Sequence, residues 1–450
     1  MLFETIIELS AEKKRGVSLE TLFKVDFKST FETKKDFGFL QLFFVARLTK
    51  NKQCFLSRFA MKGLLVSAPV ASVPLLDLKR QYAELGDAMN AALLSVNESG
   101  MFILGPEVKK LEENIAKYSR TNFAIGCASG SDALLLALMA AGVEAGDEVI
   151  VPSFTFFATA SCVPRVGATP VFADIEPTTW NLDPQEVEAK ITEKTRAIIV
   201  VHLFGQAADM PAFQAIAKRA EERFGRKVYL IEDSCQAIGA ELDGVSVGNW
   251  GDMSCLSFYP TKNLGGAGDG GMLVCNDETL AVRVKLLRAH GMEPRYYHRE
   301  IGINSRLDSY QAAILNVKLP YLDAWTEARG KNAERYDALF AAAGLGEFIA
   351  TPKKVGNRRH VWNQYVIRVF NGKRNELRAF LAEKKIGTDI YYPLGLHEQE
   401  CFAYLGYKPN DLPETRKAAD EVLALPIFPE LRPEEQEYLV ANVCEFFKKA

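Results

Sequence analysis

The chain has 450 residues, of which 48% are hydrophobic and 25% are charged, and its formal net charge is −3. This composition is typical of a globular protein long enough for two or three domains, and it excludes a mainly disordered chain. The charge lacks the basic excess of nucleic-acid-binding proteins, and no apolar run reaches the ~18 residues of a membrane-spanning helix.

Residues 1–60 differ in composition from the rest of the chain. They hold ten of the 28 phenylalanines, with 11 Lys and Arg against seven Asp and Glu. Three interpretations are open: a separate small element, a basic amphipathic arm, or upstream sequence ahead of an alternative start at Met61. Aromatic and charged residues do not segregate at helical spacing, so a membrane role is not indicated. We assign no function to the N-terminal extension, residues 1–72.

From about residue 120 short apolar runs alternate with longer helical patterns, which predicts an α/β domain with a mostly parallel sheet. Strands are expected at 123–127, 148–152, 170–174, 197–204, 228–232, 253–258 and 272–275, and helices at 131–141, 211–223 and 279–290. The pattern becomes helical from residue 307, including 332–343. Strands near 360–370 and 387–392 and a helix at 433–447 follow. We therefore expect a large domain at 73–325 and a smaller C-terminal α+β domain at 326–450.

Two motifs follow the first strands, at the edge where open α/β sheets bind ligands. Small residues between Gly126 and Leu138 place free N–H groups and hydroxyls at a helix N-terminus, which predicts a phosphate seat. The alternative is a purely structural helix cap at Ser131 or Asp132. The segment Pro152-Ser-Phe-Thr-Phe-Phe157 places aromatic rings where one could stack on a flat ligand, or else pack in the core.

A strand at 228–232 ends in two adjacent carboxylates, Glu232 and Asp233. Side chains alternate along a strand, so at most one of the two points into a given pocket. A buried carboxylate needs a donor, and a protonated pyridine nitrogen would serve; a helix cap at Asp233 is the alternative.

Lys262 follows another apolar strand and precedes a glycine-rich turn. Close backbone would desolvate the amine, lower its pKa and free it as a nucleophile for Schiff-base chemistry, although a lone lysine is usually a surface residue. Gly266, Gly268 and Gly271 spell G-x-G-x-x-G, but a strand rather than a helix is expected next, so we reject a dinucleotide site.

Metal chemistry is not indicated by the remaining reactive residues. The five histidines lack the spacing of a ligand pair, and the eight cysteines form no C-x-x-C. Scattered cysteines in apolar segments favour reduced thiols in the cytoplasm.

The order of the motifs, with the lysine 29 residues after Asp233, is the layout of fold-type-I pyridoxal-phosphate enzymes. The sequence resembles the DegT/DnrJ/EryC1/StrS family of sugar aminotransferases, within the aspartate aminotransferase superfamily. The resemblance covers about residues 73–450 and rests on six motifs in order: Gly130-Ser-Asp-Ala-Leu, Pro152-Ser-Phe-Thr-Phe, Glu232-Asp-Ser-Cys-Gln-Ala, Ser257-Phe-Tyr-Pro-Thr-Lys-Asn, Gly302-Ile-Asn-Ser-Arg-Leu-Asp-Ser-Tyr-Gln-Ala-Ala and Tyr392-Pro-Leu-Gly-Leu-His-Glu-Gln.

This resemblance implies a role for each matching residue around pyridoxal 5′-phosphate. Lys262 would bind the cofactor covalently and then carry the proton between the amino donor and the cofactor. Asp233 would keep the pyridine nitrogen protonated. Gln236 would hydrogen-bond the ring hydroxyl, and Phe156 would stack on the ring.

The phosphate and the substrate would be held by further residues. Ser131, Asp132 and Ser257 would bind the phosphate. Asn304 would reach the phosphate of the neighbouring subunit, which implies a homodimer with shared active sites; an exposed turn residue is the alternative. The resemblance points more weakly to four substrate residues, for which surface roles are equally open: Tyr297, His298, Arg306 and His397.

The resemblance thus implies a cytoplasmic aminotransferase that moves an amino group from L-glutamate to a nucleotide-linked keto sugar, for amino-sugar and cell-surface polysaccharide biosynthesis. Gln236, where many members carry His, favours a 3-keto sugar, and Lys262, which the family's dehydratases replace with His, favours transamination. A 4-keto substrate and a regulatory protein on the same scaffold are the alternatives.

Overall fold

The computed structural model describes residues 70–449. The alternative start at Met61 and nearly all of the extension predicted for residues 1–72 therefore lie outside the described residues.

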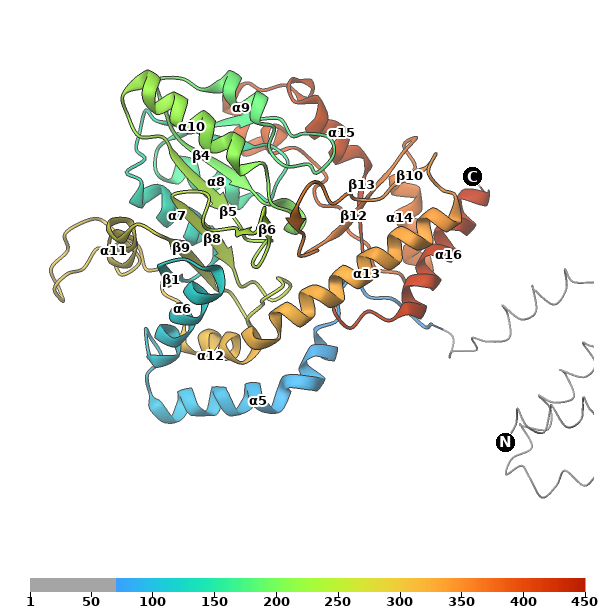
Figure 1. The fold of residues 1–450 in the computed structure, drawn as a ribbon, viewed down its shortest axis with the longest axis horizontal. Coiled ribbons are helices and arrows are strands. Elements are labelled where there is room, and N and C mark those ends of the chain that lie inside the picture. The colour runs from blue at the N-terminus through green and yellow to red at the C-terminus, as the bar shows by residue number, and fades with distance from the viewer. Residues whose placement is uncertain (1–69, 450) are drawn as a thin grey trace, which may run out of the picture. The chain divides into compact units, whose positions relative to one another are not determined.

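A seven-stranded sheet forms the centre of the larger part of the fold (Figure 1). Its strand order is β1-β9-β8-β5-β4-β2-β3, and only β9 runs against the others. This is the α/β fold with a mixed, mostly parallel sheet that the alternating pattern predicts. The strands are β1 (Phe123–Cys127), β2 (Glu148–Pro152), β3 (Thr169–Ala173), β4 (Thr195–Val201), β5 (Tyr229–Asp233), β8 (Met253–Ser257) and β9 (Gly271–Cys275).

Helices cover both faces of this sheet because alternate strand residues are apolar on each side. One face packs against α7 (Gly130–Ala140), α8 (Ala158–Arg165) and α11 (Glu278–Leu287). The other face packs against α6 (Pro106–Ser119), α9 (Pro184–Lys190), α10 (Met210–Phe224) and α12 (Ser309–Lys318). Helix α5 (Leu78–Ser99) lies along α12. A second small sheet joins β11 (Arg358–Arg359), β6 (Glu241–Leu242) and β7 (Val245–Ser246).

The C-terminal part is built on an antiparallel sheet of three strands, in the order β10-β12-β13. The strands are β10 (Ile349–Ala350), β12 (Tyr365–Val369) and β13 (Val422–Leu425). Helices α13 (Leu322–Ala343), α14 (Arg374–Glu383) and α16 (Pro433–Lys449) share one apolar core with this sheet, and α15 (Pro413–Glu421) packs nearby. Short 3-10 turns complete the connections at 203–205, 319–321, 396–398, 400–405 and 409–411.

One predicted strand is wrong. Residues 387–392 form no strand, because their backbone meets its neighbours only at single points: Gly387 N–H donates to Val73 O, and Asp389 forms an isolated bridge with Ala424. The other predicted strands and helices occur within a few residues of their expected bounds, with two exceptions. β12 begins five residues after the strand expected from 360, and α13 begins ten residues before the helix expected from 332. Among residues 70–449, no helix is both long and apolar enough to cross a membrane.

Candidate active site

The predicted site residues lie at the ends of sheet strands and in the loops that follow them. Asp233 is the last residue of β5, Ser257 the last of β8, and Ser131 lies in the first turn of α7 after β1. Because β5 and β8 are adjacent and parallel, their carboxyl ends open on the same edge of the sheet. The parallel sheet therefore gathers residues that are far apart in the sequence.

The first turn of α7 provides the anion seat. Ser129, rather than the expected Ser131 or Asp132, is the N-cap, and its Oγ accepts from Asp132 N–H at 3.1 Å. The N–H groups of Gly130 and Ser131 have no acceptor among the described residues. A Cβ on Gly130 would lie only 2.7 Å from Ser257 Cβ, so the glycine keeps this corner open beside the Ser257 hydroxyl. Free amides, a hydroxyl and the positive end of a helix suit a phosphate.

Asp233 is buried and is held from two sides. Its Oδ2 accepts from Thr159 Oγ1 at 2.7 Å, and its Oδ1 accepts from Cys235 N–H at 3.2 Å. No helix begins here, so the alternative of a helix cap is wrong. Each carboxylate oxygen can accept more than one hydrogen bond, which leaves capacity for a further donor. A protonated ring nitrogen would fill that capacity.

Gln236 and Tyr392 lie beside this carboxylate. Gln236 Oε1 accepts from Phe204 N–H at 2.7 Å, and its Nε2 donates to the Tyr392 hydroxyl at 3.1 Å. The Tyr392 ring lies 6.4 Å from that of Phe156, which is 57% exposed, so core packing is the wrong interpretation for Phe156. An exposed ring next to a polar pocket is available to stack on a planar ligand.

Lys262 lies in the turn after β8 and is half-buried. Burial lowers the pKa of its ammonium, and the nearby Cys235 and Asp233 oppose this effect. Its Nζ has no hydrogen-bond or ion-pair partner within residues 70–449. A cavity of about 90 Å³ adjoins the lysine and is lined mainly by residues of the C-terminal part, among them Asn363, Gln364 and Tyr391. The amine is thus desolvated, unpaired and open to a small ligand.

The residues predicted to contact the substrate or the neighbouring subunit differ in how exposed they are. Asn304 is exposed and forms a bridge with Ala289, while Tyr297 and His298 are exposed on the loop after α11. Arg306 is partly buried, and its Nε lacks a partner in the described structure.

His397 is buried instead, and both of its ring nitrogens are engaged. Nδ1 lies 2.6 Å from Ser153 Oγ and Nε2 lies 3.4 Å from Pro409 O. We therefore assign it structural contacts rather than substrate contact.

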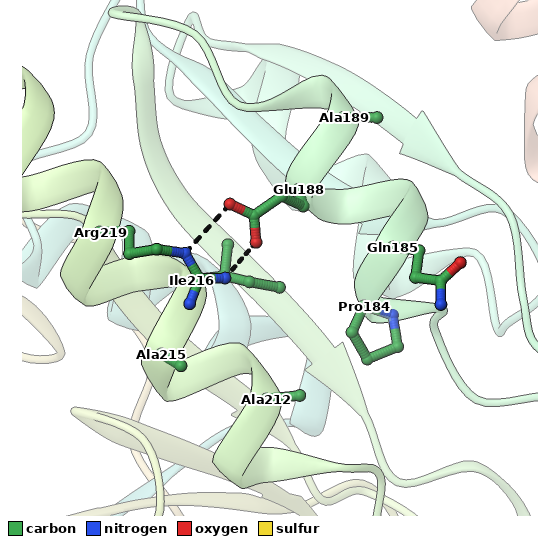
Figure 2. Close-up of a pocket in the computed structure, with 8 residues that line it drawn as sticks. All are labelled: Pro184, Gln185, Glu188, Ala189, Ala212, Ala215, Ile216 and Arg219. Carbon is green, nitrogen blue, oxygen red and sulfur yellow. Dashed lines mark hydrogen bonds and ion pairs between the residues drawn. The ribbon is translucent and has the colours of Figure 1, made fainter.

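A larger groove lies elsewhere, between α9 and α10 (Figure 2). Its volume is about 530 Å³, and Glu188 and Arg219 pair across it. The remaining lining residues are Pro184, Gln185, Ala189, Ala212, Ala215 and Ile216, none of which is nucleophilic or titratable. The groove's two charged side chains are paired with each other and it holds no nucleophile, so the chemistry is assigned to the strand ends.

Sequence reasoning missed Thr159, and it quoted Tyr392 without giving it a role. The Thr159 hydroxyl also lies 3.2 Å from that of Thr155, but Thr155 precedes α8, so no periodic pattern in the sequence indicated the role of Thr159. No local signal would have joined Tyr392 to Gln236, because 156 residues separate them. The completed set comprises an anion seat, a buried carboxylate, an exposed aromatic ring and a desolvated amine. These groups match the phosphate, ring nitrogen, ring face and aldehyde of pyridoxal phosphate.

Comparison with known proteins adds sequence and structural relatives. The model of the DegT/DnrJ/EryC1/StrS aminotransferase family matches residues 83–444. A protein named pleiotropic regulatory protein, from Geobacillus stearothermophilus, is 54% identical over 84% of this chain and 99% of its own length. The UDP-N-acetyl-3-dehydro-alpha-D-glucosamine 3-aminotransferase of Acidithiobacillus ferrooxidans is 41% identical over 83% of this chain and 97% of its own.

Solved structures share the fold over nearly their whole length. DesV of S. venezuelae, in complex with a ketimine intermediate, is 38% identical with a TM-score of 0.80, covering 85% of this chain and 100% of its own. NtdA of Bacillus subtilis, with bound cofactor PMP, is 32% identical with a TM-score of 0.77, covering 84% and 86% respectively.

Proposed function

The chain belongs to the DegT/DnrJ/EryC1/StrS aminotransferase family, and from this premise we propose that it transfers an amino group from L-glutamate to a nucleotide-linked 3-keto sugar in the cytoplasm. The observation that carries the proposal is Lys262, an amine whose pKa burial lowers and which has no partner in the part of the chain that the structure describes, close to the buried carboxylate of Asp233. Without an amine in this state the fold could bind a cofactor but could not turn over an amino donor.

The family's cofactor, pyridoxal 5′-phosphate, supplies a ring that withdraws electrons from the reacting carbon. The N–H groups of Gly130 and Ser131 and the Ser257 hydroxyl would hold its phosphate, with Asp132 in the same helical turn. Asp233 would hold a proton on the ring nitrogen, and Phe156 would cover one ring face.

Lys262 would have two tasks. Its Nζ would hold the cofactor between turnovers, and the same amine would carry a proton from the donor Cα to the cofactor. A depressed pKa suits both tasks, because the neutral amine is both the nucleophile and the base.

The choice of a 3-keto sugar is supported by Gln236 and by the 41% identical relative from Acidithiobacillus ferrooxidans, whose name places the amino group at position 3. Tyr297, His298 and Arg306 remain candidates for contacts with the nucleotide sugar. A 4-keto sugar is the alternative substrate. To decide between them, the protein is loaded with pyridoxamine phosphate and mixed separately with a 3-keto and a 4-keto nucleotide sugar. The true substrate is the one that restores the absorbance of the lysine-bound cofactor.

A homodimer with shared sites belongs to this proposal. Met101, Phe102, Ile103 and Leu104 are consecutive, and each has between 41% and 52% of its side chain exposed. A contiguous apolar run of this kind marks an interaction surface. In this proposal a second copy covers the run, and the family resemblance assigns Asn304 of one subunit to the phosphate seat of the other.

Borohydride reduction tests the cofactor attachment. The protein loaded with pyridoxal phosphate should acquire one covalently bound cofactor on the peptide that contains Lys262, as read by mass spectrometry, and Lys262→Ala should acquire none there and lose turnover. Equal labelling and turnover in Lys262→Ala would refute the proposal.

A regulatory role is the second candidate, because the 54% identical relative carries a regulatory name. Such a role would not require the desolvated lysine or the carboxylate partner. Salt-dependent DNA binding by the full chain, without transaminase activity on any keto sugar, would favour it. The basic residues 1–60 would then be the first segment to delete.

A further inference from the structure

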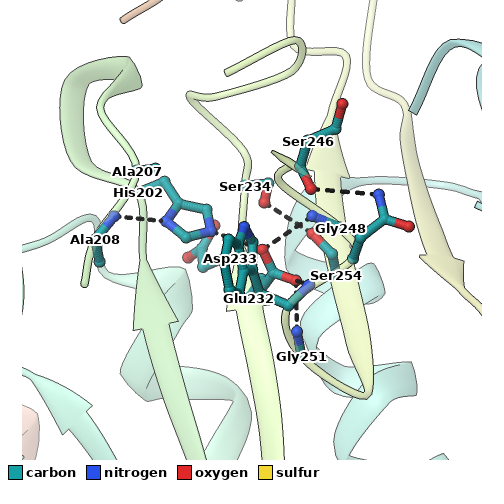
Figure 3. Close-up of polar contacts among 12 residues, drawn as sticks. His202, Ala207, Ala208, Glu232, Asp233, Ser234, Ser246, Gly248, Gly251 and Ser254 are labelled. Atoms are coloured by element: carbon teal, nitrogen blue, oxygen red, sulfur yellow. Dashed lines mark hydrogen bonds and ion pairs between the residues drawn. The ribbon is translucent and has the colours of Figure 1, made fainter. Parts of the chain in front are cut away.

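Glu232 and His202 form a buried pair on the face of β5 opposite to Asp233 (Figure 3). Neither side chain has any exposed surface, and His202 Nε2 lies 2.9 Å from Glu232 Oε2. Three backbone N–H groups, of Gly248, Trp250 and Gly251, donate to the same carboxylate at 2.8 to 3.0 Å. The carboxylate is thus saturated with donors and has no room for a ligand.

The hydrogen bonds fix which nitrogen of His202 carries the hydrogen. Ala208 N–H donates to Nδ1 at 3.1 Å, so Nδ1 is an acceptor and the hydrogen resides on Nε2, facing Glu232. The ring therefore ties the loop 202–208 to strand β5. The backbone adds a second tie, because His202 N–H donates to Asp233 O at 3.1 Å.

This loop sets the orientation of Gln236. Phe204 adopts the left-handed backbone conformation (φ 57°), which is unfavourable for a residue with a side chain and needs support from its surroundings. Its N–H points at Gln236 Oε1, so the amide oxygen must face the loop. Gln236 Nε2 then faces Tyr392, and one of its two hydrogens is left for the pocket.

We propose that the Glu232–His202 pair is a positioning device that holds Gln236 as a hydrogen-bond donor toward the ring oxygen of the cofactor. The inference rests on the proposed function, because it needs a ligand in the pocket. If the loop relaxed, the amide could rotate and present its oxygen, and two acceptors would then face each other. Both side chains are fully buried, so neither would touch the cofactor and both would act through Gln236.

Two substitutions separate the two bonds of the histidine ring. His202→Asn keeps an oxygen near the Nδ1 position and loses the bond to Glu232, whereas His202→Gln keeps a donor near Nε2 and loses the bond to Ala208. Either should speed hydrogen exchange of the 202–208 amides in the cofactor-free protein. Either should also weaken pyridoxal phosphate binding by about tenfold, as expected for one hydrogen bond to a charged group.

A double-substitution cycle distinguishes positioning from general destabilisation. In a Gln236→Met background, His202→Asn should weaken pyridoxal phosphate binding no further. The control is Ser254→Ala, which breaks another buried hydrogen bond, the one between the Ser234 and Ser254 hydroxyls (2.7 Å), without touching the loop. It should bind the cofactor as the wild type does.

Equal weakening by His202→Asn in both backgrounds, or equal weakening by Ser254→Ala, would overturn the inference. Should the His202 variants fail to fold, hydrogen exchange on the unaltered cofactor-free chain still tests it, since fast exchange at 202–208 contradicts a clamped loop. Failure of the unaltered protein to bind pyridoxal phosphate would instead refute the proposed function. The hydrogen-exchange result does not depend on cofactor binding, so the two failures can be distinguished.

Discussion

At the scale of single residues, Glu232 and Asp233 are neighbours in the sequence, but their carboxylates differ in how many further hydrogen bonds they can accept. Glu232 accepts from one imidazole and three backbone N–H groups, so its acceptor positions are filled. Asp233 accepts from one hydroxyl and one N–H, so it can still receive a proton donor. Strand alternation puts them in different environments, which the sequence predicts, but only the structure shows which of the two is saturated.

The tight packing around Gly130 predicts that adding a single methyl group there, in Gly130→Ala, disturbs the phosphate seat. In Gly130→Ala the new Cβ would meet Ser257 Cβ at 2.7 Å and Cys235 Sγ at 2.9 Å. We expect a loss of about 1–3 kcal/mol in the free energy of unfolding, typical of overpacking, and weaker binding of pyridoxal phosphate. Urea unfolding and a cofactor titration measure the two effects.

Gly330→Ala is the matched control for that substitution. Gly330 lies inside α13, and a Cβ there would meet nothing within 4 Å. The change should therefore raise the free energy of unfolding by up to about 1 kcal/mol and leave cofactor binding unchanged. If Gly130→Ala behaved like this control, the corner beside Ser257 would not be the tight seat described above.

At the scale of elements, the sequence predicts the strands well and the connections poorly. β1 and β2 have the predicted bounds, because a short apolar run between polar residues has few other ways to fold. α8 was not predicted, since it follows an aromatic segment and contains Pro164. Asp233 and Lys262 could be predicted from the sequence because they lie at or just after the end of a strand. The roles of His202, Thr159 and Tyr392 could not, because they depend on contacts between segments that are far apart in the sequence.

The turn that carries Lys262 is held by a second lysine. Lys318, at the end of α12, is buried and donates from Nζ to Gly265 O at 2.8 Å. Burial lowers the pKa of Lys318 from 10.5 to about 8. Between pH 8 and 10.5 the unfolded chain therefore binds more protons at this group than the folded chain. The free energy of unfolding should then rise with pH through this window, by at most about 1.4 kcal/mol per pH unit.

Lys318→Met should remove this rise. Urea unfolding at pH 8, 9 and 10 would show a shallower pH dependence than in the unaltered protein. Lys218→Met, at an exposed position on α10, should keep the original slope. Parallel curves for the unaltered protein and Lys318→Met would contradict the assignment.

At the scale of the whole molecule, the described chain leaves two of the predicted site residues and a run of apolar side chains exposed. Phe156 and Asn304 are exposed, and so is the run from Met101 to Leu104. The composition predicts a globular chain without indicating this surface, because an exposed apolar residue in a short loop is indistinguishable in sequence from a buried one. A second copy of the chain would account for both observations.

Shared sites predict a specific outcome when two inactive variants are combined. Lys262→Ala removes the amine from a site, and Asn304→Ala removes the residue that a subunit would lend to its partner's site. In a mixed dimer one site would carry both defects and the other neither, and half of randomly assembled dimers are mixed. Co-expression should therefore restore about a quarter of the unaltered activity, above the sum of the separately purified variants. Activity no higher than that sum, with both variants dimeric in sedimentation velocity, would show that each subunit builds its site alone.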